Sequence, residues 1–118
     1  MSFALSLLFF SCKKNQAGGN ATISGIVKHH SKVINNATVF IKYNAKELPG
    51  TDTTLYDDKL KVDANGNFKF ELYKGNYFLY AVGYDYAIPA PYKVVAGLPV
   101  KLRAKENVEV TIYVTEGD

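Results

Sequence analysis

The sequence predicts an all-β domain, a β-sandwich of seven short strands. Three observations support this fold class. Apolar and polar residues alternate in short runs separated by turn residues, which is the pattern of half-buried strands. No stretch keeps the 3.6-residue period of an amphipathic helix. The chain is also rich in strand-forming aromatic residues, with nine Tyr and seven Phe among 118 residues.

The predicted strands are bounded by Gly, Pro, Asn and Asp residues. They cover residues 21–28, 37–43, 59–62, 68–72, 77–84, 92–103 and 108–114. The first strand places Ile23 and Val27 on one face, and the second strand places Val39 and Ile41 there. A loop rich in Gly, Pro, Thr and Asp spans residues 44–58 and leads into the short third strand.

The later strands follow the same alternation. The fourth alternates without a break from Phe68 to Leu72, and the seventh from Val108 to Val114. The sixth is interrupted at Gly97 and Pro99, as an edge strand or a bulge allows. The inward residues should form one core that includes Phe70, Leu79, Val110 and Ile112.

One turn is specific enough to compare with known domains. Asp63-Ala-Asn-Gly-Asn67 lies between two predicted strands, where Asn65 and Gly66 can take the positive φ of a tight hairpin. The order "SGIV", "NNATVFIKY", "VDANGNFKFEL", "KGNYFLYAVGYD" closely resembles the carboxypeptidase regulatory-like domain, a transthyretin-like (prealbumin-like) sandwich. The resemblance covers residues 21–114 and rests on Gly25, Ala37, Asp63, Gly66, Phe68, Gly75, Tyr77 and Leu79.

That resemblance implies a Greek-key topology. It also implies an accessory or binding module of the kind found beside enzymes and outer-membrane receptors, rather than a catalyst.

The first residues of the chain indicate its location. Residues 1–11 are uncharged, largely apolar and too few to span a bilayer, but they suit the short apolar segment of a signal peptide. Ser11 followed by Cys12 resembles the lipobox of bacterial lipoproteins, in which the cysteine is acylated after cleavage. We therefore expect a lipoprotein signal peptide over residues 1–11, an acylated Cys12 with a flexible tether over 12–20, and the sandwich over 21–115.

The lipobox resemblance implies a lipid-anchored protein of the cell envelope, at the outer membrane. Two alternatives stay open. One is a cytosolic protein whose Cys12 is buried in a strand, and the other is a cleaved signal peptide that leaves an unmodified thiol.

Composition limits the partners. The formal net charge is +3, and the sequence has no basic cluster beyond Lys13 and Lys14, so we expect no nucleic-acid partner. A single cysteine excludes a disulfide framework. We expect a monomer without a cofactor, held at the membrane through Cys12, with an envelope protein or a glycan as partner.

Two acidic segments of the sequence are candidate calcium sites. The segment from Asp63 to Asn67 begins like an EF-hand loop, but it lacks the Gly at position six and the Glu at position twelve that an EF-hand requires. A looser site formed by Asp52, Asp57 and Asp58 stays open, because carboxylates bind hard cations. Ion pairs with nearby lysines are the favoured alternative.

Catalytic motifs are absent from the sequence. His29 and His30 are adjacent, would face opposite sides of a strand, and are expected to lie in the loop after the first strand. Transthyretin-like enzymes that hydrolyse a purine-breakdown intermediate share this general fold and a Tyr-Arg-Gly-Ser ending. This chain instead ends Tyr113-Val-Thr-Glu-Gly-Asp118, and its only arginine is Arg103. No Gly-x-Ser-x-Gly, P-loop or Rossmann motif occurs, so we expect no enzyme activity.

The 44–58 loop contains one candidate modification site. Asp52-Thr53-Thr54 resembles the O-glycosylation sequon of envelope proteins in some Gram-negative bacteria, which makes Thr53 the candidate acceptor.

Aromatic residues supply the candidate binding surface. Alternation places Phe40, Phe78 and Tyr80 on the outward faces of their strands, and Tyr84, Tyr86 and Tyr92 bracket a loop. Exposed aromatics beside polar groups suit sugar rings or a protein partner. The alternative is that the rings pack across neighbouring strands and stiffen the sheet.

The sequence therefore favours a lipid-anchored, non-catalytic envelope module that binds a protein or a glycan. A structural adhesin or fimbria-associated lipoprotein is the alternative, and a hydrolase is the least favoured class.

Overall fold

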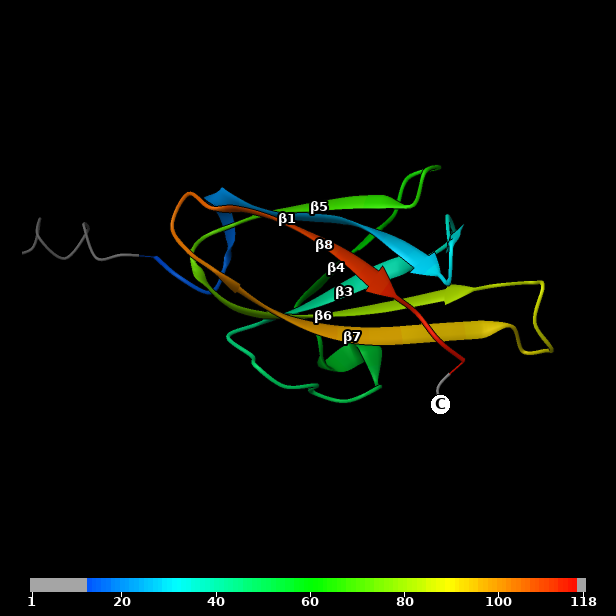
Figure 1. Cartoon of the computed structure of the whole chain (residues 1–118). Helices are drawn as coiled ribbons and strands as arrows, with labels where there is room; N and C mark the ends of the chain where they lie inside the picture. The colour runs from blue at the N-terminus through cyan, green and yellow to red at the C-terminus, as the bar shows by residue number, and fades with distance from the viewer. Residues whose placement is uncertain (1–12, 117–118) are drawn as a thin grey trace, which may run out of the picture.

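The computed structural model describes residues 13–116 as two β-sheets packed face to face (Figure 1). The strands are β1 (Ala17–His29), β2 (Lys32–Val33), β3 (Thr38–Tyr43), β4 (Asp58–Lys61), β5 (Asn67–Leu72), β6 (Gly75–Tyr84), β7 (Lys93–Leu102) and β8 (Asn107–Tyr113), with a short 3₁₀ helix at Thr53–Leu55. Each predicted run contains a strand, so the all-β prediction is confirmed. The count of seven is wrong, because the two-residue β2 adds an eighth strand.

One sheet is organised around β1. The strand β8 pairs with β1 in parallel, whereas β5 and then β2 pair with it antiparallel. The other sheet has the order β4-β3-β6-β7 and is antiparallel throughout. The predicted interruption of the sixth strand is wrong, since β7 runs unbroken through Gly97 and Pro99, but β7 does lie at the end of its sheet order as expected.

The core fills the space between the sheets. It contains the predicted inward residues of β1, β3, β5, β6 and β8, with Ile23, Val27, Val39, Ile41 and Leu79 fully buried. Of the four residues expected to share it, Phe70, Leu79 and Ile112 are buried, and Val110 packs against them partly buried. The period-two alternation therefore placed the core correctly.

The turn from Asp63 to Asn67 joins the two sheets. Because β4 pairs with β3 and β5 pairs with β1, the turn is a crossing between sheets, and the predicted hairpin of paired strands is wrong. The backbone of Gly66 has φ 78°, as predicted, whereas Asn65 does not take a positive φ. The Asp63 carboxylate accepts hydrogen bonds from the amides of Asn65 and Asn67, both at 2.9 Å, so it shapes the turn.

The segment before residue 21 differs from the prediction of a flexible tether. The strand β1 begins at Ala17, and the Asn15 amide donates to the carbonyl of Lys74 at 2.8 Å. The Asn15 side chain in turn accepts from the Asn76 amide at 2.9 Å. Residues from Asn15 onward therefore belong to the folded domain. The predicted signal peptide (1–11) and Cys12 lie outside the described residues.

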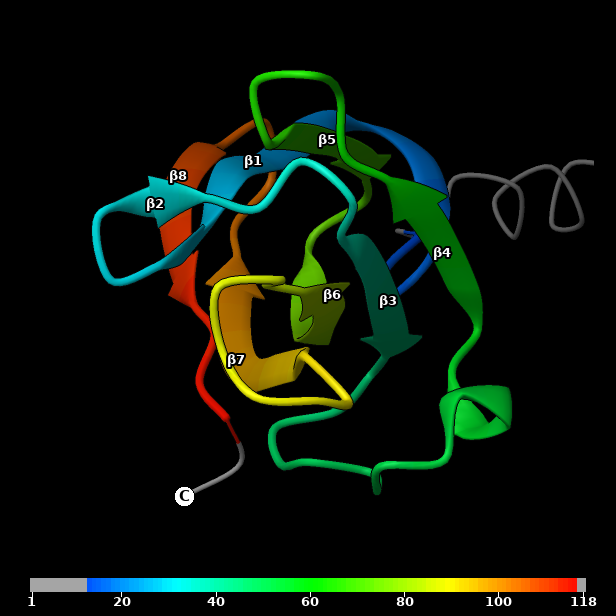
Figure 2. The same ribbon diagram turned by 90° about the vertical axis from the view of Figure 1, so that its right-hand side faces the viewer.

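A long loop covers the outer face of the second sheet. Residues 44–58 cross the side of that sheet that faces away from β1 (Figures 1 and 2). Tyr56 stacks on Tyr80 with ring centroids 5.7 Å apart, and it tilts against Phe40 at 6.0 Å. Tyr80 and Phe78 are both buried, with exposed fractions of 4% and 6%. The expectation that these two rings lie on the surface is wrong, and Phe40 is half-buried.

Within residues 13–116, no helix has the length and apolar character needed to cross a membrane.

Candidate functional site

The loop that joins β6 to β7 carries the exposed aromatic residues. This aromatic loop, residues 84–93, projects from one end of the sandwich (Figure 1, yellow) and faces the viewer in Figure 2. Tyr86 is 70% exposed and its ring centroid lies 5.1 Å from that of Tyr92, which is 36% exposed. Tyr84 is 41% exposed. The three tyrosines predicted in this loop are therefore on the surface, unlike Phe78 and Tyr80.

A buried carboxylate holds the base of the aromatic loop. Asp85 lies 2.7 Å from His29 Nδ1 and 2.8 Å from Lys32 Nζ, and it accepts from the Ala87 amide at 3.0 Å. These hydrogen bonds, above all those from Lys32 and His29, hold the pKa of Asp85 well below its usual range. Because an ionised carboxylate only accepts, Nδ1 of His29 carries the proton. The cluster ties the aromatic loop to the turn between β1 and β2.

Further hydrogen bonds fix the loop backbone. Asn36 brackets Tyr84, since its side-chain amide donates to the Tyr84 carbonyl at 3.0 Å and its oxygen accepts from the Tyr84 amide at 2.9 Å. The Asp85 amide donates to the Tyr92 carbonyl at 2.8 Å, and the Tyr92 amide donates to the carbonyl of Pro89 at 3.1 Å. The loop therefore presents its rings from a preorganised backbone, which lowers the entropic cost of binding.

A groove of about 470 Å³ lies beside the aromatic loop. Its lining residues are Thr51, Tyr80, Ile88, Pro89, Ala90, Pro91, Tyr92, Lys93, Val95 and Glu116. Most of its lining is aliphatic or aromatic, whereas Thr51, Lys93 and Glu116 supply a hydroxyl, a cation and a carboxylate. A mostly apolar lining with a few polar groups is the composition of small-ligand sites.

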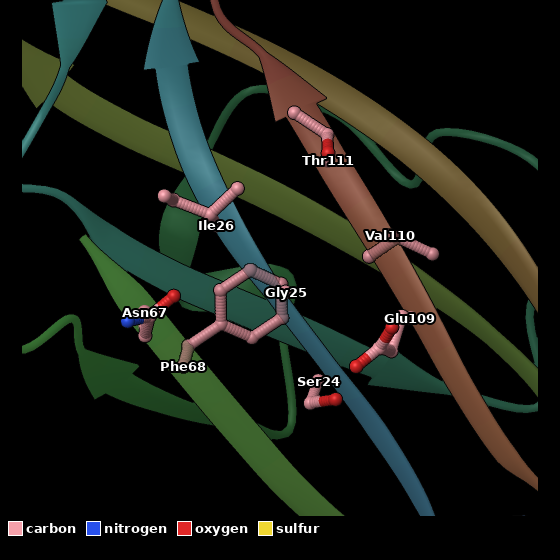
Figure 3. Close-up of a pocket in the computed structure, with 8 residues that line it drawn as sticks. All are labelled: Ser24, Gly25, Ile26, Asn67, Phe68, Glu109, Val110 and Thr111. Atoms are coloured by element: carbon pink, nitrogen blue, oxygen red, sulfur yellow. The ribbon is translucent and has the colours of Figure 1, made fainter. Parts of the chain in front are cut away.

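A second hollow, of about 380 Å³, lies on the sheet formed by β1, β5 and β8 (Figure 3). It is lined by Ser24, Gly25, Ile26, Asn67, Phe68, Glu109, Val110 and Thr111. Phe68 extends toward Gly25, where a Cβ atom would lie 3.0 Å from its ring. Because Phe68 is buried, this hollow presents no exposed aromatic ring, and the groove beside the aromatic loop is the better candidate for a ring-shaped ligand.

The three aspartates considered for calcium have other partners. Asp52 caps the 3₁₀ helix by accepting from the Thr54 amide at 3.0 Å and the Thr54 hydroxyl at 2.7 Å, which lowers the pKa of Asp52. Asp57 accepts from the Tyr43 amide at 2.7 Å. Among the described residues, no three His, Cys, Asp or Glu side chains are grouped as a metal site, so Asp52, Asp57 and Asp58 do not come together as one.

Two further sequence predictions concern Thr53 and the histidines. Thr53 opens the 3₁₀ helix and is half-buried, and its glycosylation stays a prediction. The expectation that both histidines lie in a loop is wrong for His29, which ends β1 and is buried, whereas His30 is exposed. Sequence reasoning missed the pairing of His29 with Asp85, because 56 positions separate them. The feature of the sequence that pointed to this part of the molecule was the group of tyrosines around the loop, Tyr84, Tyr86 and Tyr92.

No model of a known protein family matches the sequence, and no curated protein matches it. One similar solved structure, from Pseudomonas aeruginosa, is the crystal structure of a "putative carbohydrate binding protein". The two align with a TM-score of 0.55 and 14% sequence identity, over 92% of this chain and 95% of that chain. At this identity the similarity shows the fold alone.

Proposed function

We propose that the protein is a lipid-anchored, non-catalytic module of the cell envelope that binds a glycan in the groove beside the aromatic loop. The observation that carries the proposal is the exposed ring of Tyr92, which lines a largely apolar groove that also has polar residues in its lining, and which lies against the exposed ring of Tyr86. Sugar rings present an apolar face and a rim of hydroxyls. Tyrosine rings match the apolar face, and Thr51, Lys93 and Glu116 match the hydroxyls.

The fold comparison supports the same class of ligand, since a sandwich of this shape occurs in a protein described as carbohydrate-binding. Within the all-β class, we assign the sandwich to the transthyretin-like, Greek-key group on the sequence motifs. The lipid anchor rests on Ser11 and Cys12 in the sequence. We also propose that the anchored module lies at the outer membrane and that it is a monomer.

A glycan microarray tests the proposal. The full chain is applied beside a Tyr92→Ala variant, and beside a Tyr113→Ala variant as the matched control, because Tyr113 is 60% exposed on β8. Removal of a central aromatic contact costs more than about 1 kcal/mol, so Tyr92→Ala should raise the Kd for the bound glycan at least about fivefold. Tyr113→Ala should leave it unchanged. Equal binding by wild type and Tyr92→Ala would refute the site, and assembly of the purified chain into filaments would favour a structural adhesin instead.

A further inference from the structure

The end of the sandwich opposite the aromatic loop is basic. Six exposed cationic side chains gather there, namely Lys13, Lys14, Lys74, Lys101, Arg103 and Lys105. They come from the start of the described chain, the turn between β5 and β6, and the end of β7 with the turn that follows it. Figure 1 shows these segments at the left of the molecule and the aromatic loop at the right.

The backbone brings these charges together. A hollow of about 510 Å³ has Lys14, Lys74, Lys101 and Arg103 in its lining. A neighbouring hollow of about 230 Å³ shares Lys74 and adds Lys13 and Lys105. The convergence depends on the hydrogen bond from the Asn15 amide to the Lys74 carbonyl, which holds the first lysines against the turn that carries Lys74.

Little negative charge offsets this basic end. Within residues 13–116, none of its six cations takes part in a salt bridge. In the turn that carries Arg103 and Lys105, the side chain of Glu106 accepts from the backbone amide of Arg103 at 2.9 Å. Lys13 lies 5.8 Å from the centre of the Tyr73 ring, a contact that leaves its charge available.

We propose that the basic end docks on the anionic lipid headgroups of the membrane to which the protein is anchored. This inference rests on the lipid anchor of the proposed function. Asn15, which is hydrogen-bonded to the fold, is three residues along the chain from Cys12, so the two Cα atoms lie at most about 11 Å apart. That span is close to the Debye length of about 8 to 10 Å, so an acylated Cys12 brings the cations within the field of the headgroups.

The docking has two consequences. The basic end adds an electrostatic attraction to the hydrophobic anchoring that the acyl chains of Cys12 provide. The orientation is also fixed, because contact at the basic end points the aromatic loop away from the bilayer (Figure 1). The sandwich then acts as a spacer that presents the groove to a ligand outside the membrane surface.

Vesicle co-sedimentation tests the docking without the acyl chains. The full chain carrying Cys12→Ser is mixed with vesicles of phosphatidylcholine alone or of an equal mixture with phosphatidylglycerol. Each cation near an anionic surface strengthens binding about fivefold. The additional changes Lys74→Gln, Lys101→Gln and Arg103→Gln should therefore weaken binding to the mixed vesicles on the order of 100-fold.

The matched control removes three charges elsewhere. Lys59→Gln, Lys61→Gln and Lys69→Gln lower the net charge equally, but these exposed lysines lie on β4 and β5. The control should bind within about twofold of the parent, and high salt should release all forms. Equal weakening by the two triple variants would overturn the proposal, because the attraction would then depend on the net charge of the protein and not on the basic end. Absence of binding to the mixed vesicles would also overturn it.

Glycan binding separates this inference from the proposed function. The Lys74, Lys101 and Arg103 variant should keep its glycan affinity, since none of these residues lines the groove and the aromatic loop lies at the other end of the sandwich (Figure 1). Normal glycan binding without vesicle binding would therefore refute the docking alone.

Discussion

Gly66 offers a quantitative test of how the two sheets are joined. Its backbone φ is 78°, and its amide donates to the Asp63 carbonyl at 2.9 Å. An added Cβ would lie 2.4 Å from Cγ1 of Val33, a distance that requires one of the two to move. The left-handed backbone costs an alanine about 1 to 2 kcal/mol, and overpacking adds about 1 to 3 kcal/mol. Gly66→Ala should therefore lower the free energy of unfolding by about 2 to 5 kcal/mol.

Urea denaturation followed by circular dichroism measures this loss, with Gly18→Ala as the control. Gly18 also has a positive φ, of 102°, but its added Cβ would lie 3.8 Å from the nearest atom of Tyr73, an ordinary contact. Gly18→Ala should therefore show the backbone cost without the steric one. In the Gly66→Ala background, Val33→Ala should recover about 1 to 3 kcal/mol by removing the clashing methyl group. Equal losses at the two glycines, with no recovery, would refute the reasoning.

Three further predictions concern the loop cover, the buried acid and the anchor. Phe78→Ala should lower the free energy of unfolding, measured in urea, by about 3 to 5 kcal/mol, because the ring is buried. Tyr113→Ala should change it by no more than about 0.5 kcal/mol, because that ring is exposed. Similar losses for the two variants would mean that the loop does not cover the sheet. Folding lowers the pKa of Asp85, so the ionised carboxylate stabilises the folded state at a pH above its ordinary pKa of about 3.9. This stabilisation is lost as the pH falls below that value. Asp85→Asn should therefore speed hydrogen exchange of the aromatic loop at neutral pH and weaken the acid dependence of stability, and an unchanged acid profile would contradict this. Cys12→Ser should move the protein from the membrane to the soluble fraction, and mass spectrometry that finds an unmodified thiol on the mature wild-type chain would end the lipoprotein hypothesis.

The strands could be predicted because their side chains repeat every two residues. That period identified the inward faces of β1, β3, β5, β6 and β8. It could not predict β2, since a two-residue strand has no pattern. The segment from Asn15 to Asn20 has the composition of a linker, yet tertiary contacts order it: the Tyr73 amide donates to the carbonyl of Gln16 at 2.9 Å.

The surface was harder to predict than the core. Alternation shows which face of a sheet a ring lies on, but it does not show whether a loop covers that face, as Tyr56 covers Tyr80. The pairing of His29 with Asp85 joins distant parts of the chain. The basic end likewise draws its charges from three separate segments, so no cluster is visible in the sequence beyond Lys13 and Lys14. The tyrosines of the aromatic loop were predictable because they lie together in one short segment between β6 and β7.

The central claim is that the groove beside the aromatic loop binds a glycan. The most direct measurement is an amide NMR titration of the isotope-labelled protein with the oligosaccharide that binds best on the array. We predict shifts confined to the aromatic loop and to the other residues that line the groove, namely Thr51, Tyr80, Val95 and Glu116. Shifts centred on Ser24 and Glu109 in the hollow of Figure 3, or no shifts at saturating oligosaccharide, would contradict the claim.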